Sequence, residues 1–301
     1  MRPIGSWTTG GLSATLPPAA VAPFLLLPAR THREAEQRQR WGRGTFRLQS
    51  IDLPSPSRYA SPVRPVVSCV MLTTHPKRAR YLPDALRSYR GQTLAERELV
   101  IVNDGALLAS RAPDVTVINL PDRGSRWTIG EKRNVGVRFA RGEFVATWDD
   151  DDVSLPGRLA AQVALARTCG ADYVLADRML IATPDMALIG RCDRGRPVQA
   201  SALIRRNAVV AAGGYRPIDY LEDWSLLERI RYLALGTIWE VPESDWYVMR
   251  RHGDNVTNTQ GESDCEYGVC AMRDPNVSPQ QRELDALRRG PGAEDIYEPS
   301  I

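Results

Sequence analysis

The sequence predicts an α/β protein with a doubly wound, mostly parallel central sheet flanked by helices. Three observations lead to this prediction. Short apolar runs alternate with helical patterns, polar turns follow the runs, and one run leads directly into four consecutive aspartates. In an open sheet of this kind, ligands bind in the crevice beyond the carboxyl ends of the strands. We therefore expect the polar turns to form one site.

The apolar runs give the order β-α-β-β-α-β for the first part of the chain. Strands are predicted at 66–72, 98–102, 115–119 and 144–148, and helices at 81–92 and 131–141. A third helix, at 155–168, is expected to open the second part of the chain. The second part is less regular. A strand pair is expected at 173–182 and 186–191, further strands at 200–204 and 237–249, and helices at 206–212, 222–235 and 280–289.

Three regions follow from this pattern. Residues 1–64 are rich in Pro, Gly, Ser and Arg and lack a period, which predicts a disordered or loosely docked extension. The periodic region, 65–258, is expected to form one domain with halves at 65–152 and 153–258. Residues 259–301 are expected to be a tail with one helix.

Composition excludes several functional classes. The formal net charge of +3 gives no reason to expect stable nucleic-acid binding. The five scattered cysteines suggest neither a disulfide framework nor a zinc site, so we expect a cytoplasmic protein, including the periphery of the membrane. Residues 19–29 form the longest apolar stretch, but they are too few to span a bilayer, so no transmembrane segment is expected.

The aspartate run, residues 149–152, is the strongest chemical signal. It follows the buried strand 144–148, where four adjacent carboxylates repel one another and raise each other's pKa. A hard divalent cation with oxygen ligands would relieve this repulsion. The alternative is a solvated acidic turn that caps the next helix. The spacing does not match an EF-hand loop.

Other polar groups stand at similar positions. Asp104 follows the second strand and could accept hydrogen bonds from a nucleobase or ribose, while Thr73 and Thr74 end the first strand. Arg133 begins a helix, where its guanidinium could pair with a base or a diphosphate. The alternatives are ordinary turns for the strand ends and a solvated helix face for Arg133.

Two further segments carry charge. Glu222 and Asp223 open a helix, which the helix dipole alone could explain. Arg250 and His252 lie in a basic loop after the last strand, where they could clamp a diphosphate and ligate a metal; a solvated charge run is the alternative.

Over residues 66–258, the chain resembles the family 2 glycosyltransferases, which have the GT-A fold. The resemblance depends on the order of several short motifs more than on any one of them. These are SCVMLTTHPKR (68–78), VIVNDG (100–105), EKRNVG (131–136), GEFVATWDDDD (142–152), the segment 200–215, LEDW (221–224) and RRHGDN (250–255). The family's opening loop has a different sequence, and residues 1–64 have no counterpart in the motif set.

The resemblance implies a GT-A-type, Rossmann-like domain with a smaller acceptor-side β/α region. It implies metal-dependent, inverting transfer of a hexosyl or related sugar from a UDP- or GDP-sugar to an acceptor hydroxyl of undetermined type. The D-x-D motif would place Mn²⁺ or Mg²⁺ at Asp151, with Asp149 on the ribose or the ion, Asp104 and Arg133 on the base, and Asp223 as general base. The remaining expected contacts with the nucleotide sugar are Thr73, Thr74, Asp150 and Arg250, and His252 is expected as a further metal ligand.

The sequence leaves two other functions open. A nucleotidyltransferase on a related sheet is one, although a glycine-rich phosphate loop is missing after the first strand. A non-catalytic carbohydrate- or metal-binding module is the other. It would explain the aspartate run but not the Asp223 helix and the RRHGDN loop together.

Overall fold

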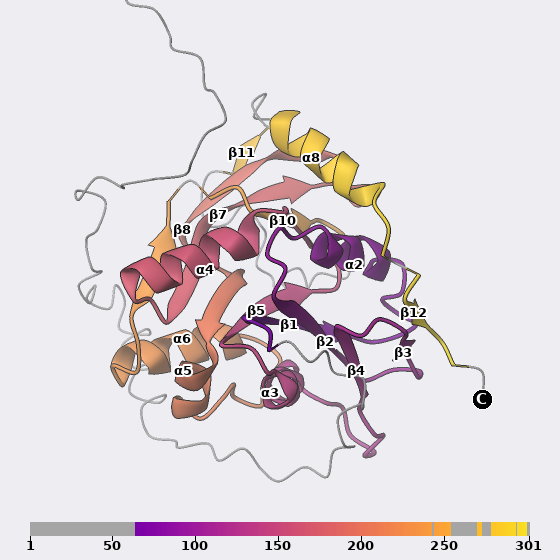
Figure 1. Cartoon of the computed structure of the whole chain (residues 1–301), viewed down its shortest axis with the longest axis horizontal. Helices are drawn as coiled ribbons and strands as arrows, with labels where there is room; N and C mark the ends of the chain where they lie inside the picture. Colours follow the sequence, from indigo (N-terminus) through magenta and orange to yellow (C-terminus); the bar gives the residue numbers. More distant parts are fainter. Residues whose placement is uncertain (1–63, 243, 254–269, 273–277, 293, 300–301) are drawn as a thin grey trace, which may run out of the picture.

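The computed structural model describes residues 64–242, 244–253, 270–272, 278–292 and 294–299. A large mixed sheet runs through the molecule, with strand order β4-β2-β1-β5-β8-β7-β10-β6 (Figure 1). The strands of the first half are β1 (Val67–Thr73), β2 (Arg97–Asn103), β4 (Val115–Asn119) and β5 (Phe144–Asp149). These four strands pair in parallel, so their carboxyl ends lie at one edge, as expected.

The second half of the sheet is antiparallel where it joins β5. The strands there are β6 (Val153–Ser154), β7 (Tyr173–Ala182), β8 (Leu188–Arg205), β9 (Ile238–Val241) and β10 (Tyr247–Arg250). β8 pairs antiparallel with both β5 and β7, and β10 pairs parallel with β7. This mixed α/β architecture confirms the predicted fold class. The expected short strands 186–191 and 200–204 are parts of the long strand β8.

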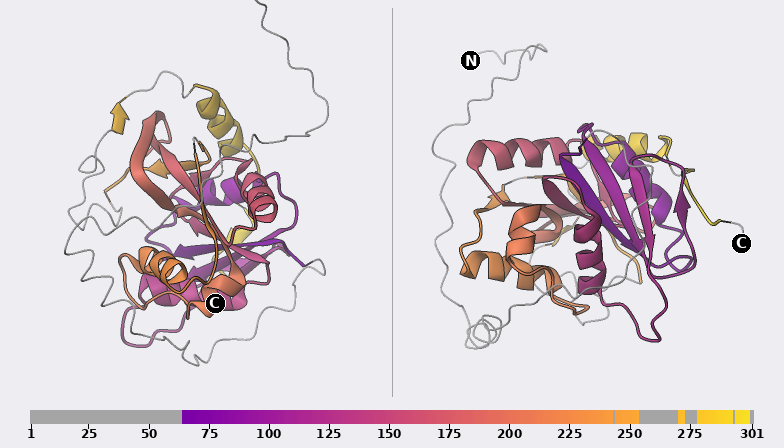
Figure 2. Two further views of the ribbon diagram at one scale, coloured as in Figure 1. Left: turned by 90° about the vertical axis from the view of Figure 1, so that its left-hand side faces the viewer. Right: turned by 60° about the horizontal axis from the view of Figure 1, so that its bottom comes forward.

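Helices cover both faces of the sheet (Figures 1 and 2). The helices on one face are α2 (Leu82–Arg90) and α4 (Arg158–Cys169); those on the other are α3 (Ile129–Phe139), α5 (Arg206–Ala211) and α6 (Glu222–Tyr232). The first face is closed by Leu86, Tyr89 and Leu159, and the second by Val209 and Leu227 among others. Strands buried on both faces explain why the predicted strands read as continuous apolar runs.

Helix α8 (Ser278–Arg288) follows the expected terminal helix closely and packs on the domain near α2. Its Leu284 is fully buried against Val153, Met186 and Val248. The short strands β3 (Ala109–Ser110) and β12 (Ile296–Tyr297) pair in a separate small sheet, and β11 (Cys270–Met272) pairs with β8. The expected extension, residues 1–64, lies outside the described residues except for Arg64.

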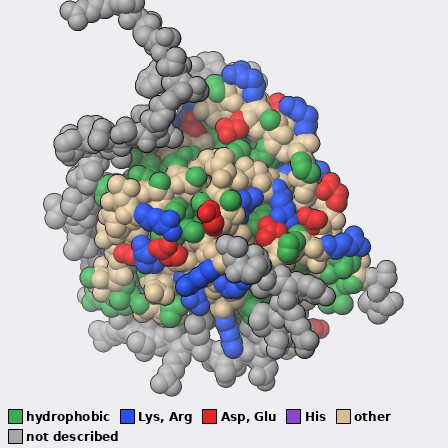
Figure 3. Space-filling model, in the orientation of Figure 1, with side chains coloured by type: hydrophobic (Ala, Val, Ile, Leu, Met, Phe, Trp, Pro, Cys, Tyr) green, Lys and Arg blue, Asp and Glu red, His purple; other side chains and the backbone are tan. Residues whose placement is uncertain are grey.

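Acidic and basic side chains are interspersed on the face seen in Figure 3. None of the helices in the described ranges has both the length and the apolar character needed to cross a lipid bilayer.

Candidate active site

A cleft of about 1120 Å³ opens at the carboxyl edge of the parallel strands. Its walls come from the loops after β1, β2, β4 and β5, from the start of α6, and from β8 and β10. Of the expected site residues, it is lined by Thr73, Thr74, Asp104, Arg133, Asp149, Asp150, Asp151 and Asp223. Arg250 and His252 are not among its lining residues. The topology thus brings eight of the ten expected residues together.

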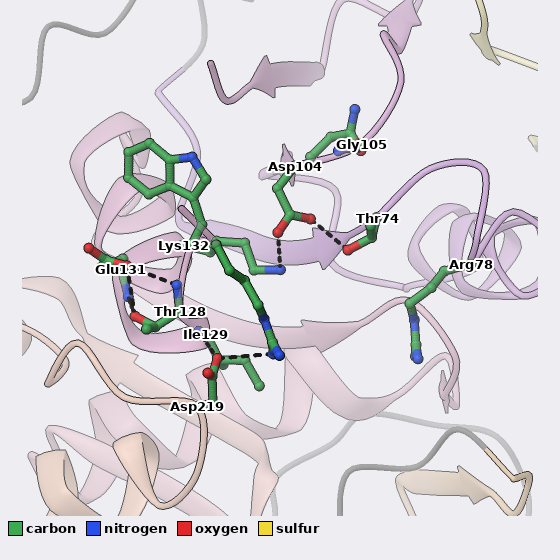
Figure 4. Close-up of polar contacts among 12 residues, drawn as sticks. Thr74, Arg78, Asp104, Gly105, Thr128, Ile129, Glu131, Lys132 and Asp219 are labelled. Atoms are coloured by element: carbon green, nitrogen blue, oxygen red, sulfur yellow. Dashed lines mark hydrogen bonds and ion pairs between the residues drawn. The ribbon is translucent and has the colours of Figure 1, made fainter. Parts of the chain in front are cut away.

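Asp104 is held from two sides. The Thr74 hydroxyl donates to its Oδ1 at 2.6 Å, and the Lys132 ammonium donates to its Oδ2 at 3.0 Å (Figure 4). The next residue must be glycine, because a Cβ on Gly105 would lie 1.9 Å from the carbonyl oxygen of His75. This close approach sets the loop after β2 against the loop after β1, and so places Asp104 beside Thr74.

Lys132 is fixed by the start of α3. Thr128 caps this helix by accepting from the backbone N–H of Glu131 at 3.3 Å, and the Glu131 carboxylate accepts in return from the Thr128 N–H at 2.8 Å. This capping box sets the register of the first turn. Lys132 then faces Asp104 while Arg133, one position on, points elsewhere.

Arg133 pairs with other carboxylates and not with Asp104. Its Nε donates to Glu222 Oε1 at 2.9 Å, and its Nη2 lies 3.8 Å from Asp149 Oδ1. The guanidinium therefore links the aspartate run to the start of α6. The side chain next to Asp104 is Lys132, which the sequence analysis did not single out. The capping pattern Thr128 to Glu131, together with the rarity of lysine in this chain, is the signal that could have found it.

The four aspartates have different surroundings. The Tyr247 hydroxyl lies 3.0 Å from Asp149 Oδ2 and also hydrogen-bonds Asp152, whose other oxygen accepts from the Arg250 backbone N–H at 2.8 Å. Burial, and then the charge of Asp151, raise the pKa of Asp152 well above the ordinary value. Asp152 is therefore held by structural hydrogen bonds.

Asp150 and Asp151 share a basic partner. Arg78 Nε donates to Asp150 Oδ1 at 2.8 Å, and its Nη2 pairs with Asp151. Burial, followed by the Asp151 charge, raises the pKa of Asp150 to about 6. Burial also opposes ionisation of Asp151, but the hydrogen bond with His252 and the charge of Arg78 outweigh it and lower its pKa.

His252 and Arg250 lie behind this group. His252 Nε2 is 2.9 Å from Asp151 Oδ2, and its ring stacks on Tyr81 with centroids 4.4 Å apart. The Arg250 guanidinium donates to Asp84 Oδ2 at 2.6 Å, which directs it away from the cleft lining. The last two residues of the RRHGDN segment lie outside the described residues.

Asp223 and Glu222 form a second set of carboxylates in the cleft, at the start of α6. The N-cap residue of this helix, Leu221, has φ 62°, a left-handed conformation that is strained for a residue other than glycine and that turns the chain into the helix. Burial, then the neighbouring Glu222 carboxylate, raises the pKa of Asp223 to about 7, although Arg133 acts against this rise. Its Oδ1 accepts from the Trp224 backbone N–H at 2.6 Å.

Comparison with known proteins identifies the domain. Residues 69–186 match the model for glycosyl transferase family 2, a segment that contains Thr73, Asp104 and the aspartate run. This segment, which is less than half of the chain, is similar to glycosyl transferase family 2. The match confirms the predicted resemblance over these residues.

Curated relatives share parts of the chain's length. The amylovoran biosynthesis glycosyltransferase AmsE of Erwinia amylovora is 26% identical over 176 residues, which are 52% of this chain and 65% of AmsE. EpsH of Bacillus subtilis (strain 168) is 37% identical over 83 residues, which are 24% of this chain and 22% of EpsH. The matched segments thus span less than two thirds of either relative.

Two solved structures have a similar chain course over part of the molecule. S. aureus TarS 1-349 in complex with UDP-GlcNAc is 16% identical and has a TM-score of 0.49, covering 64% of this chain and 60% of that one. The mannosyltransferase PcManGT from Pyrobaculum calidifontis, in complex with GDP-Man and Mn²⁺, is 15% identical with a TM-score of 0.44, covering 84% and 75%.

Proposed function

We propose that this protein is a family 2 glycosyltransferase that transfers a sugar from a UDP- or GDP-sugar to an acceptor hydroxyl with inversion, and that a divalent cation assists the reaction. One observation carries the proposal. A single cleft holds Asp104 with its Lys132 partner, the aspartates at the end of β5, and Asp223, whose pKa lies near neutrality. These are the groups that base recognition, diphosphate binding and proton removal each require.

Asp104 and Lys132 offer a hydrogen-bond acceptor and a cationic donor to a nucleobase. Each Asp104 oxygen already accepts one hydrogen bond but can accept a second. An acceptor next to a cationic donor matches a ring N–H beside a carbonyl, which uracil and guanine present. Cytosine and adenine present an exocyclic amine beside an unprotonated ring nitrogen, which also offers one donor and one acceptor. The choice of UDP- and GDP-sugars therefore follows from the family resemblance and not from Asp104 and Lys132.

The aspartate run suits a cation that is bound mainly by substrate. Within the ranges that the structure describes, no three His, Cys, Asp or Glu side chains are grouped closely enough to hold a metal ion. Magnesium-type ions commonly use only one or two carboxylates and take their other ligands from phosphates and water. Asp149 and Asp151 provide such a pair of carboxylates, and His252 lies 2.9 Å from Asp151.

These residues would hold Mn²⁺ or Mg²⁺ in the presence of the donor. The bound ion supplies Lewis-acid chemistry, since it neutralises charge on the leaving diphosphate. Asp149 is positioned by the hydroxyl of Tyr247 and would face the ribose or the ion. We assign Asp150 and Thr73 to the diphosphate side of the cleft, which both of them line.

Asp223 is proposed as the general base. An acceptor hydroxyl must lose its proton as it attacks, and a base works best when its pKa lies near the operating pH. The pKa of about 7 satisfies this condition, and the hydrogen bond from the Trp224 N–H keeps one oxygen oriented. Attack on the face opposite the leaving diphosphate in a single displacement inverts the anomeric centre.

A panel of nucleotide sugars with Mn²⁺ tests this function. We expect UDP or GDP to be released from one UDP- or GDP-sugar, with faster release when a suitable acceptor is added. Release of pyrophosphate would instead support a nucleotidyltransferase. Sugar or metal binding without either product would support a non-catalytic module.

A further inference from the structure

Arg78 makes the closest basic contacts with the aspartate run. Its Nε donates to both oxygens of Asp150, at 2.8 and 3.0 Å, while its Nη2 reaches Asp150 at 2.8 Å and also pairs with Asp151. The two carboxylates are 3% and 8% exposed as residues, so water does little to separate their charges. The guanidinium therefore provides charge neutralisation that an ion would otherwise give.

The Asp151 oxygen nearest to Arg78 is already saturated. Its Oδ2 pairs with Arg78 Nη2 and also lies 2.9 Å from His252 Nε2. A carboxylate oxygen has two lone-pair positions, so a cation that binds this oxygen must displace one of these partners. His252 is stacked on Tyr81 and has a side chain only 4% exposed, whereas that of Arg78 is 21% exposed and lines the cleft. Arg78 is the partner that can move.

We propose that Arg78 competes with the divalent cation for Asp151 and, once displaced, binds the diphosphate of the donor. The inference rests on the proposed function, because it concerns the same cleft. An arginine suits both roles, since its planar fork pairs with carboxylates and phosphates alike. Tyr81, whose ring centroid is 5.5 Å from the Arg78 guanidinium carbon, supports the side chain from the protein side.

Calorimetry with MnCl₂ alone tests the competition. At about pH 8, well above the ordinary carboxyl pKa, we expect Arg78→Gln to bind Mn²⁺ about tenfold more tightly than the parent, the equivalent of one charged hydrogen bond. With Mn²⁺ saturating, the same variant should bind UDP and GDP about tenfold more weakly, because it lacks the phosphate contact. The inference thus predicts changes of opposite sign in two affinities.

Arg123→Gln is the matched control. It also removes one arginine charge, but its guanidinium pairs with Glu131 outside the cleft lining. We expect both of its affinities to equal those of the parent. Arg78→Lys keeps the charge without the fork and should lie between the parent and Arg78→Gln in Mn²⁺ affinity; it also serves if the glutamine variant does not fold.

Equal or weaker Mn²⁺ binding by both Arg78 variants would overturn the inference, as would unchanged nucleotide affinity in both. Failure of the proposed function has a different signature. In that case the parent protein itself would bind neither UDP nor GDP, with or without Mn²⁺.

Discussion

Asp223 offers the sharpest single test, because the same side chain should weaken the fold and drive the reaction. In the substitution Asp223→Asn, the amide oxygen can still accept the 2.6 Å hydrogen bond from the Trp224 N–H. The substitution removes only the ionisable group. We expect it to reduce transfer by about 10²–10⁴-fold, the usual contribution of a positioned general base.

The stability effect follows from the raised pKa. A carboxyl group whose pKa rises from 3.8 to about 7 on folding binds its proton more tightly in the folded state. The stability that this protonated group contributes is fully present when the pH is below the pKa of the unfolded state. It is lost as the pH rises through the pKa of the folded state. When the pH is above both pKa values, ionising Asp223 in the folded protein costs about 4 kcal/mol of stability. Partial solvent screening reduces our expectation to about 2 kcal/mol.

Thermal unfolding as a function of pH is the assay. Asp223→Asn should melt about 5 °C above the parent at about pH 8, and this gain should shrink towards zero at about pH 4. Glu222→Gln is the matched comparison. It should lower the pKa of Asp223 and so move the acidic limb of the parent's pH–rate profile to lower pH, with a smaller loss of turnover. A fully active Asp223→Asn enzyme would reject the assignment of the base, and a melting difference independent of pH would refute the electrostatic reasoning.

Three further predictions concern other parts of the chain. Lys132→Met should weaken UDP or GDP binding by about tenfold in calorimetry, since Asp104 loses its ammonium partner; Arg123→Gln is the control, and equal affinities would remove Lys132 from the base site. Deletion of residues 1–60 should leave nucleotide affinity unchanged, because the cleft lining begins at Leu72 among the residues that the structure describes; a core that unfolds on truncation would show that the segment packs on the domain. Leu284→Ala should lower the free energy of unfolding by about 2–5 kcal/mol in denaturant titration, because Leu284 is fully buried, and a loss below about 1 kcal/mol would contradict the docking of α8.

The parallel half of the sheet was predictable because its strands are buried on both faces. The runs 66–72, 98–102, 115–119 and 144–148 each match an observed strand within one or two residues. The second half was harder to predict. β8 includes Gly195 and Pro197, which interrupt an apolar pattern although the backbone stays extended. β8 pairs with β7 on both sides of these two residues, at Asp193 and Val198, and local propensity does not record such pairing.

The positions of the site carboxylates were predictable, but their partners were not. Strand ends identified Asp104 and the aspartate run, since parallel strands bring their carboxyl ends together. The partners depend on helix register and on chain reversals. Lys132 contacts Asp104 and Arg133 does not, because consecutive residues of α3 point in different directions. The Tyr247 hydroxyl contacts Asp149, which lies 98 residues away in the sequence. Long-range contacts of this kind leave no periodic signal in the sequence.

The central claim is that one cleft binds a nucleoside-diphosphate sugar and transfers its sugar. The most direct measurement is the release of nucleoside diphosphate from a panel of UDP-, GDP-, CDP- and ADP-sugars in Mn²⁺, with Asp104→Ala and Asp151→Asn as site variants and Arg123→Gln as the control. We predict that the parent and Arg123→Gln release UDP or GDP, that both site variants lose most of this release, and that the CDP- and ADP-sugars stay intact. Equal release by the parent and both site variants, or release from none of the sugars, would contradict the claim.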